Sequence, residues 1–356
     1  MLRLLLFGTF AIMLVIGSLY ANESAAPQPW QISVQWDNDL LTGTDEGYTN
    51  GARIAFARAL SADSSQHNQL QNILRRLTGA ESDSALDALR FPGLGALRFQ
   101  YGIGLSQLMF TPQDPDAPTP LPGERPYAAW SGLEFSLQAS AQNSASTATL
   151  SIGTTGKLSY GQDMQDWIHK NVSDSPIFQG WDSQAPGELT LNLHLDHKRR
   201  IRFLDTTDRW PIQVDGFAEW GAAIGNLRTD LYAGTHLRAG RNLPDNHLTP
   251  RVQLGSFTET LFRHETANIS AFSFYGFAGV RGYGVLHDIT LDGPLFRDWD
   301  ESVDAEPWVG ELSFGLASRY DSLEISLSHT IRTDEFDGQR NRSRYGSVLF
   351  RFSRKF

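Results

Sequence analysis

An alternation of apolar and polar residues at period two returns in segment after segment of this chain and constrains its fold more than any other feature. The stretch Leu189–Asp196, LTLNLHLD, is a clear example. Successive side chains of a strand point to opposite faces, so each such segment predicts a strand with one apolar face. The predicted strands lie near residues 30–39, 49–60, 96–110, 126–140, 146–158, 187–203, 210–224, 228–240, 268–285, 307–319, 322–333 and 343–356.

The number and the length of these strands separate two folds that both alternate. A soluble β-sandwich has the same pattern, but ten or more strands of roughly ten residues with polar inner positions are typical of an outer-membrane barrel. Beyond the first 21 residues no stretch is apolar enough for a membrane helix. Such a chain crosses a bilayer only as a closed barrel. We therefore predict an all-β fold, a transmembrane antiparallel β-barrel of about 12 strands with a short helix in an extracellular loop.

The N-terminal residues predict export. A short basic start, Met1–Arg3, precedes the almost wholly apolar Leu4–Tyr20, and Ala21 is a suitable last residue before cleavage. This pattern is typical of a secretory signal peptide. The alternative is a retained anchor helix of about 17 residues, at the short limit for a membrane span. We predict a signal peptide over residues 1–21 and a single outer-membrane β-barrel domain over residues 22–356.

Two aromatic features favour the cell outer membrane. Tryptophans gather near predicted strand ends, as the interface girdles of membrane barrels require. They are Trp30, Trp36, Trp130, Trp210, Trp220 and Trp308. An alternating strand that stops on an aromatic, Phe356, resembles the signal that the barrel assembly machinery recognises.

Composition excludes several other functions. The net charge of −10 argues against a nucleic-acid partner. The absence of cysteine rules out disulfides and Cys-based metal or nucleophile sites. His194 and His197 lie three residues apart on one predicted strand and point to opposite faces, which argues against a shared metal site.

Strand order predicts which loops face the exterior. Barrels of this class keep both termini in the periplasm, so the first strand runs outward. The loops predicted to be extracellular are 40–48, 111–125, 159–186, 286–306 and 334–342. Residues 61–95 form an unusually long periplasmic loop, in which Gln69–Leu77 predicts a short amphipathic helix.

The first candidate site lies in the first predicted hairpin. The stretch Trp36–Gly51 has the sequence WDNDLLTGTDEGYTNG. Alternation on both sides of this loop brings Asn38, Asp39 and Thr49 together at the mouth of the hairpin. The alternative is an ordinary surface turn, because turns favour Asp, Asn and Gly.

The Pro-rich loop Thr111–Pro126 contains a second candidate, Arg125. Gly123 before it and Pro126 after it restrict the backbone, which predicts a guanidinium held in place. The alternative is a solvated arginine in a stiff barrel loop.

A third candidate lies in the predicted extracellular loop 159–186. Met164, Trp167 and Ile168 fall on one face of a short helix that His169 flanks. A helix across the barrel mouth would place His169 above the first hairpin. The alternative is an exposed helical histidine with no chemical role.

Together these motifs resemble the outer-membrane lipid A 3'-O-deacylases. The resemblance spans Gln31 to Phe356 and rests on several motifs in order. They are Asn38–Asp39, Tyr48–Gly51, Gly123–Tyr127, Trp167–Lys170 and Gln179–Asp182. The resemblance implies a barrel of the same strand number and calcium-dependent hydrolysis of the ester at the 3' position of lipid A, the membrane anchor of lipopolysaccharide.

Residue by residue, the resemblance implies catalytic roles for Asn38, Asp39, Thr49 and His169. Calcium would be bound by Asn38 and Asp39, and Arg125 is implied in substrate binding. One position departs from the family pattern: six residues after His169, where members can have Glu, this chain has Ser175 beside Asp174.

These residues suggest a mechanism in which neutral His169 takes a proton from water and directs the hydroxide at the ester carbonyl. Calcium suits the amide–carboxylate pair because hard cations prefer oxygen ligands. The chain has no G-x-S-x-G motif, which favours water over a serine nucleophile. Two further functions remain open: an outer-membrane phospholipase that pairs His169 with a serine, and a non-enzymatic barrel or pore.

Overall fold

A computed structural model of the chain describes residues 30–39, 47–78, 98–141, 143–173, 175–205, 212–244 and 272–354. The predicted signal peptide lies outside these residues, as do Trp210, Asp174 and Phe356. The predictions that rest on them stay predictions.

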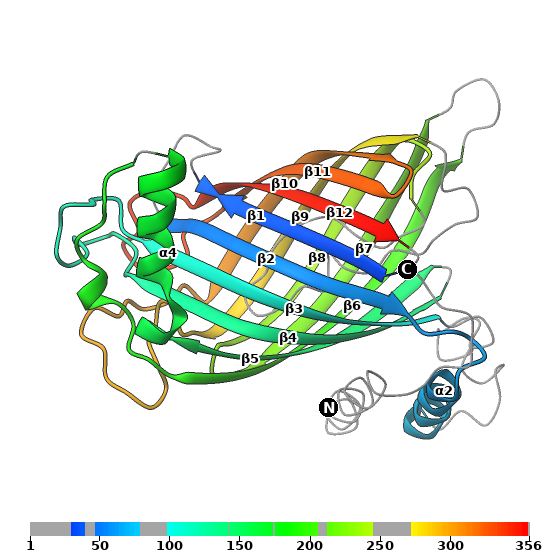
Figure 1. Cartoon of the computed structure of the whole chain (residues 1–356), viewed down its shortest axis with the longest axis horizontal. Coiled ribbons are helices and arrows are strands. Elements are labelled where there is room, and N and C mark those ends of the chain that lie inside the picture. The colour runs from blue at the N-terminus through cyan, green and yellow to red at the C-terminus, as the bar shows by residue number, and fades with distance from the viewer. Residues whose placement is uncertain are drawn as a thin grey trace.

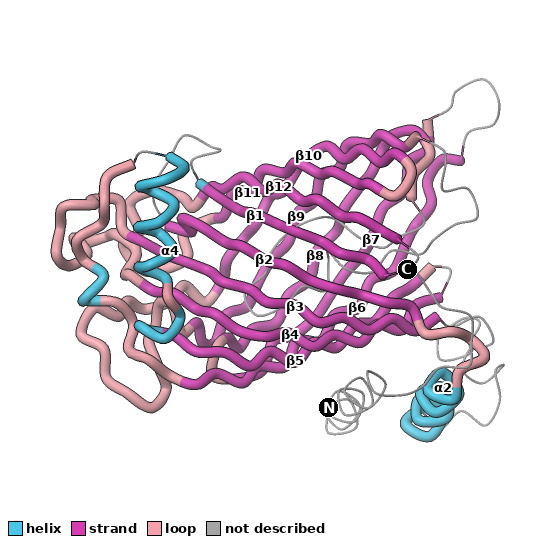
Figure 2. Tube along the Cα trace, viewed as in Figure 1, coloured by secondary structure: helices cyan, strands magenta, loops and turns pink. Residues whose placement is uncertain are grey.

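The described residues form one closed antiparallel β-barrel of twelve strands, which confirms the predicted fold (Figures 1 and 2). The strands are β1 (Trp30–Asn38), β2 (Gly47–Ala59), β3 (Arg98–Thr111), β4 (Ala128–Ala141), β5 (Ser144–Thr155), β6 (Leu189–Asp205), β7 (Gln213–Gly225), β8 (Arg228–Arg241), β9 (Ser273–Asp288), β10 (Trp308–Tyr320), β11 (Leu323–Arg332) and β12 (Arg344–Arg354). Each strand pairs with its neighbours in the chain, and β1 pairs with β12 to close the sheet.

The closing pair fixes which loops share an end of the barrel. Trp30 at the start of β1 lies opposite Arg354 of β12, so both ends of the described barrel meet at one rim. The loops after odd-numbered strands therefore lie at the other rim, which carries most of the long loops and is at the left in Figure 1. With periplasmic termini, this loop-rich rim is extracellular.

Short helices lie at both rims of the barrel. Helix α2 (Ser65–Thr78) follows β2, where sequence predicted a helix over residues 69–77. Ser64 accepts a hydrogen bond from the His67 backbone N–H at its start. After β5 come the 3₁₀ turn η3 (Gly156–Ser159), helix α4 (Gly161–Ile168), the π-helical turn η4 (His169–Ser173) and the 3₁₀ turn η5 (Trp181–Ser183).

None of the helices in the described part of the chain is both long and apolar enough to cross a bilayer.

The wall of the barrel is apolar outside and polar inside. On β1, Val34 and Trp36 are 43% and 37% exposed, whereas Ser33 and Gln35 between them are buried. The same alternation leaves Leu105 of β3 57% exposed. This polarity is the reverse of a soluble protein and is what a barrel surrounded by lipid requires.

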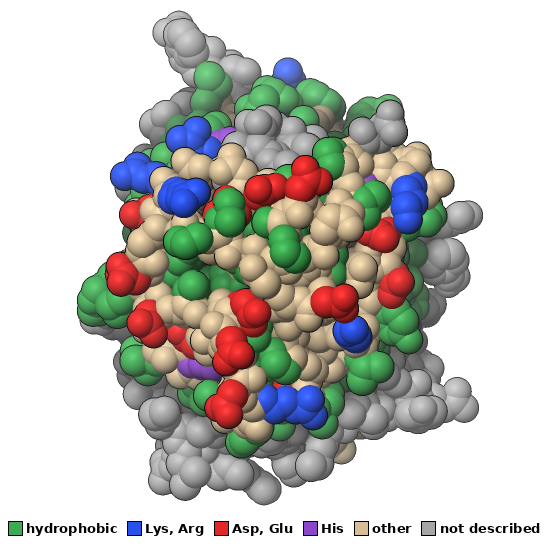
Figure 3. Space-filling view, turned by 90° about the vertical axis from the view of Figure 1, so that its left-hand side faces the viewer, with side chains coloured by type: hydrophobic (Ala, Val, Ile, Leu, Met, Phe, Trp, Pro, Cys, Tyr) green, Lys and Arg blue, Asp and Glu red, His purple; other side chains and the backbone are tan. Residues whose placement is uncertain are grey.

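Ion pairs fill the lumen. The buried pairs include Arg53–Glu134 at 3.0 Å, Arg281–Glu219 at 2.6 Å, Arg238–Asp215 at 2.6 Å and Arg351–Glu324 at 3.2 Å. Near the loop-rich rim an aromatic and aliphatic cluster adds Tyr48, Leu108, Phe110, Trp130, Trp299 and Tyr345. Figure 3 shows this rim closed by loops and side chains. A lumen packed in this way does not favour a diffusion pore.

The Arg53–Glu134 pair gives a test of the packed lumen. In Glu134→Ala, Arg53 keeps a buried charge without this partner, and the barrel should lose about 3–5 kcal/mol of stability. Urea unfolding of the folded barrel in lipid vesicles measures this loss. The double variant Arg53→Met with Glu134→Leu removes both charges and should recover most of it. A single variant as stable as the wild type would contradict the inference.

Candidate active site

The first hairpin turns the amide of Asn38 toward the outer wall. Asn38 lies two residues after the exposed Trp36, so its side chain points to the same, outer face of β1. It lies opposite Asn50 of β2. A β-bulge between Tyr48 and Asn50 inserts Thr49. Asn38 Nδ2 donates a hydrogen bond to the Thr49 carbonyl at 3.0 Å. The structure thus brings two of the predicted site residues into contact.

The side chain of Thr49 meets a residue that sequence reasoning missed. Its hydroxyl lies 2.5 Å from the hydroxyl of Thr111, at the end of β3. Both threonines are buried, as is Asp39 directly after β1. No sequence motif marks Thr111, because its place depends on the pairing of β2 with β3.

Helix α4 lies on the outer wall of the barrel beside the mouth. Gln107 Nε2 and Ser131 Oγ both donate to the Ser159 carbonyl at 2.7 Å, just before the helix. A Cβ on Gly161 would meet Ala129 of β4 at 2.3 Å, so glycine permits this close approach. The sequence predicted a helix across the barrel mouth. The helix instead packs against the outer side of the extracellular ends of β3 and β4.

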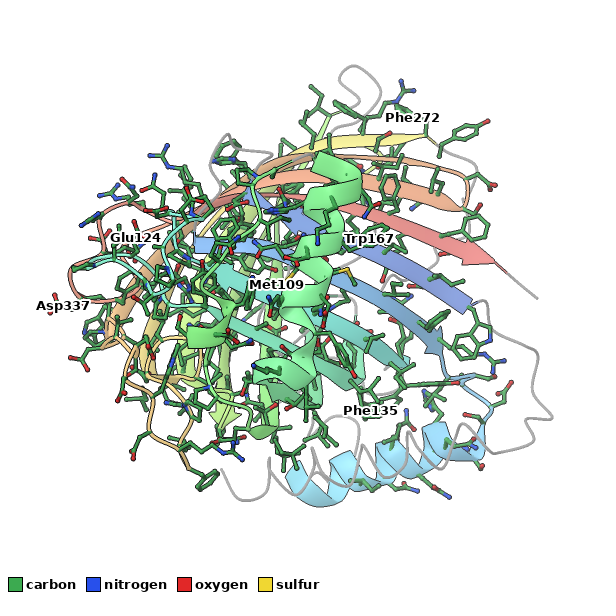
Figure 4. All side chains as sticks on the ribbon, turned by 60° about the vertical axis from the view of Figure 1, so that its left-hand side comes forward. Met109, Glu124, Phe135, Trp167, Phe272 and Asp337 are labelled. Carbon is green, nitrogen blue, oxygen red and sulfur yellow. The ribbon has the colours of Figure 1, made fainter. Side chains whose placement is uncertain are left out.

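A largely aromatic cluster packs the segment that follows α4, which contains Phe178 and Trp181, against the same wall. It contains Met109, Tyr127, Ala129, Phe178 and Trp181, with Ile168 packed against it. Figure 4 shows Met109 beneath α4. Trp181 Nε1 donates to Gln165 Oε1 of α4 at 2.6 Å and so ties the loop to the helix.

His169 is buried at the start of η4 with a defined tautomer. Its Nδ1 lies 2.6 Å from the carbonyl oxygen of Pro176. A carbonyl only accepts, so Nδ1 carries the proton and Nε2 of the neutral ring keeps its lone pair. Phe178 packs against the ring, with centroids 5.8 Å apart. The imidazole is thus held as a proton acceptor at Nε2.

Strand register relates His169 to the hairpin. Met109 lies opposite Asn50, and Asn50 lies opposite Asn38 on the far side of β2. Met109 also belongs to the cluster of Phe178, the ring that contacts His169. The histidine and the hairpin residues therefore share one end and one outer wall of the barrel.

Arg125 has partners inside the barrel mouth. Its guanidinium donates to Glu335 Oε2 at 3.1 Å and to Thr290 Oγ1 at 2.9 Å. It also lies 4.3 Å from the ring centroid of Phe110, which alternates with Met109 and so faces the lumen. Burial lowers the pKa of Arg125, although Glu335 opposes the shift. Its implied role in substrate binding stays a prediction.

Histidines outside the candidate site have structural partners. His197 packs on Trp220 at 4.5 Å and bonds Ser146 through Nδ1 at 2.7 Å. His194 is buried beside Asn192, with 3.1 Å between Nε2 and the amide nitrogen. The two histidines point to opposite faces of β6, as predicted from their spacing.

The donor set at the hairpin fits a hard cation. Asn38 and Asp39 offer an amide oxygen and a carboxylate, which are ligand types that Ca²⁺ prefers. Within the described residues no group of three or more His, Cys, Asp or Glu side chains gathers. Calcium binding by Asn38 and Asp39 therefore stays a prediction.

A closed antiparallel barrel with an apolar exterior and a covered polar site on its outer wall defines an outer-membrane β-barrel protein. The model of the family outer membrane protein LpxR matches residues 5–355, and the chain belongs to that family. This membership confirms the resemblance and the predicted location in the outer membrane.

Two solved structures resemble the chain, and the first of them shares its fold. LpxR from Salmonella typhimurium matches with a TM-score of 0.67 and 18% identity over 90% of this chain and 99% of that one. The β domain of the Bordetella autotransporter BrkA matches with a TM-score of 0.42 and 9% identity over 92% of this chain and 99% of that one. No curated protein matches the sequence.

The carboxyl of Glu335 makes the mouth sensitive to acid. Burial alone would raise its pKa, but Arg125, Arg332 and a hydrogen bond from Ser343 lower it from 4.5 to about 2. A carboxyl with a depressed folded pKa stabilises the protein above its unfolded pKa and loses this effect as pH falls.

Glu335→Gln should therefore cost about 3 kcal/mol at neutral pH. The difference from wild type should shrink as pH falls from 4.5 toward 2, because protonated Glu335 then resembles glutamine. The midpoints of urea unfolding of both proteins at a series of pH values measure this difference in stability. Asp337→Asn, on the exposed tip of the same loop (Figure 4), is the matched control. A constant difference across this range would contradict the assignment.

Proposed function

We propose that this protein is an outer-membrane lipid A 3'-O-deacylase that hydrolyses the 3' ester by calcium-dependent attack of water. Family membership supports lipid A deacylation as the general activity. The observation that carries the finer proposal is His169, whose Nδ1 is bonded to Pro176 and whose Nε2 is left as the acceptor.

The position of the site suits a lipid substrate. The outer wall at the extracellular rim is level with the outer leaflet, where the esters of lipid A lie at the boundary between acyl chains and headgroup. A site on this wall takes its substrate sideways from the membrane. The packed lumen offers no comparable route.

Proton transfer is the task of His169. Nε2 removes a proton from water while the oxygen attacks the ester carbonyl. The imidazolium then gives this proton to the departing sugar oxygen, which leaves a free hydroxyl on lipid A and a fatty acid. Because Pro176 accepts from Nδ1, it also stabilises the charged ring.

The hairpin supplies polar groups around the reacting carbonyl. Thr49, held by Thr111, orients the water or adds a hydrogen bond. Asn38 and Asp39 would hold the metal. Calcium, when bound, supplies positive charge that stabilises the oxyanion of the transition state.

Arg125 would contact a phosphate of lipid A bidentately. Its present bonds to Glu335 and Thr290 mean that this contact must compete with an existing ion pair. We therefore place the phosphate contact at the barrel mouth and not among the groups that act on the ester.

His169→Ala should abolish release of the 3' acyl chain, with a loss of about 10²–10⁴-fold, because a general base contributes in this range. Mass spectrometry of lipid A from a host that lacks the activity measures it. His287→Ala, at the extracellular end of β9, should leave activity unchanged. Full activity in His169→Ala, with folding shown by heat-modifiable migration, would contradict the role of His169 as the general base. Release of glycerophospholipid acyl chains instead would identify a phospholipase.

Chelation of calcium should stop deacylation in outer-membrane vesicles, and added Ca²⁺ should restore it better than Mg²⁺, which demands stricter geometry. Asp39→Asn should raise the Ca²⁺ concentration needed for half-maximal activity. Asp163→Asn, on the exposed side of α4, is the matched control. Activity that persists in excess chelator would rule out the metal.

A further inference from the structure

Helix α4 exposes large apolar side chains on the side away from the barrel. Its face on the barrel carries the buried Gly161 and Gln165 and also Ile168, which packs against the aromatic cluster, and the buried His169 directly follows the helix. Met164 and Trp167 point away from the barrel and are 40% and 57% exposed. A helix between a protein core and water turns its large apolar side chains toward the core, and Met164 and Trp167 depart from this rule.

The exposed surface of α4 has two edges of different character. Tyr160, Met164 and Trp167 follow one another at spacings of four and three, and they form an apolar edge. Tyr160 is 63% exposed. The opposite edge is polar and consists of Gln162, Asp166 and Lys170, with an ion pair of 3.5 Å between the last two.

The apolar edge is turned toward the membrane band. Helix α4 runs across the strands near the loop-rich rim (Figure 1). One edge therefore faces along the wall toward the membrane and the other faces the exterior. Figure 4 shows Trp167 on the side of α4 turned toward the middle of the barrel. Leu105 and Leu133 of the strands below are 57% and 44% exposed, so the apolar surface continues from wall to helix.

We propose that α4 is a membrane-interface helix whose apolar edge, Tyr160, Met164 and Trp167, is embedded among the acyl chains of the outer leaflet. Its polar edge lies among headgroups and water. Helices with a Trp-containing apolar edge and a charged opposite edge lie in this way in the plane of the interface. Tyrosine and tryptophan favour this depth, because their rings are apolar with a polar tip.

Embedding the helix would fix the depth of the histidine. His169 directly follows the last residue of α4, two positions after Trp167. A helix held in the leaflet keeps His169 Nε2 at the boundary between acyl chains and headgroup. The lipid surface thereby becomes a structural partner of the site, independent of the chemistry that the site performs.

The absence of cysteine makes a direct test possible, because each single cysteine is the only one in its variant. Trp167→Cys and Met164→Cys report the apolar edge, and the exposed Gln162→Cys reports the polar edge. Leu105→Cys is the lipid-facing reference on β3. Each variant is spin-labelled in vesicles of lipopolysaccharide and phospholipid, and collisions with oxygen and with a water-soluble nickel chelate are compared.

Labels at 164 and 167 should collide mainly with oxygen, as the Leu105→Cys label does, and the label at 162 should collide mainly with the nickel chelate. Nickel collisions at 167 equal to those at 162 would overturn the proposal. Spectral broadening at 167 that disappears on dilution with unlabelled protein would overturn it too, since a second copy would then cover the edge. Heat-modifiable migration shows that each variant is folded.

An activity measurement shows what the embedding does. Trp167→Asp should lower deacylation of lipid A in vesicles by roughly tenfold and have a much smaller effect in detergent micelles, whose surface adapts to the helix. Equal losses of activity in vesicles and in micelles would contradict the proposal that the embedded helix fixes the depth of His169. The collision data need no turnover, so they stand or fall separately from the proposed hydrolysis.

Discussion

The pairing of β1 with β12 is the interaction on which the rest of the structure depends. In a bilayer no water satisfies a free strand edge, so every backbone group of the sheet must find a partner within it. The closing register from Trp30 opposite Arg354 to Asn38 opposite Gly346 pairs the first and last strands of the described sheet, so neither keeps a free edge. It also holds β1 on both sides, and Asn38 and Asp39 lie at the end of this doubly held strand. The fold and the position of the candidate metal ligands therefore have a common origin.

The distribution of polarity follows from the same closure. Lipid takes the place of a hydrophobic core outside the wall, so the inner positions are free to be charged. They are filled by ion pairs such as Arg281 with Glu219 and Arg238 with Asp215. Because the lumen is packed with side chains, a lipid can contact the protein at the outer wall and at the extracellular loops. The buried His169 lies on that wall under a loop that covers β3 and β4.

Sequence predicted the strands well, because burial on one face imposes period two. Deviations have local causes: β5 ends at Thr155 rather than near residue 158, since Gly156 has a φ of 69° and begins a 3₁₀ turn. The orientation of α4 was not predictable in the same way. The sequence predicts one helical face for Met164, Trp167 and Ile168, but only the position of the helix on the outer wall shows that Ile168 packs inward while Met164 and Trp167 face outward.

Contacts across long sequence separations were also out of reach. Arg125 could be seen to be held in place, but not that Glu335, 210 residues away, holds it. The same is true of Thr111, whose approach to Thr49 depends on strand register. The Asn38–Thr49 contact was accessible because both residues lie in one hairpin.

The bulge at Thr49 has a consequence for how this hairpin tolerates change. The extra residue shifts the alternation of β2, so Asn50 stays on the outer wall while Tyr48 turns into the lumen and packs edge to face against Tyr345, with ring centroids 4.8 Å apart. Removing Thr49 alone would leave Tyr48 opposite Phe110 and Asn50 opposite Met109, so both side chains would keep their faces and the strand would regain a regular alternation. The pairing of the wall therefore does not need the bulge. What the bulge positions is the Thr49 hydroxyl beside Thr111 at the rim of the barrel.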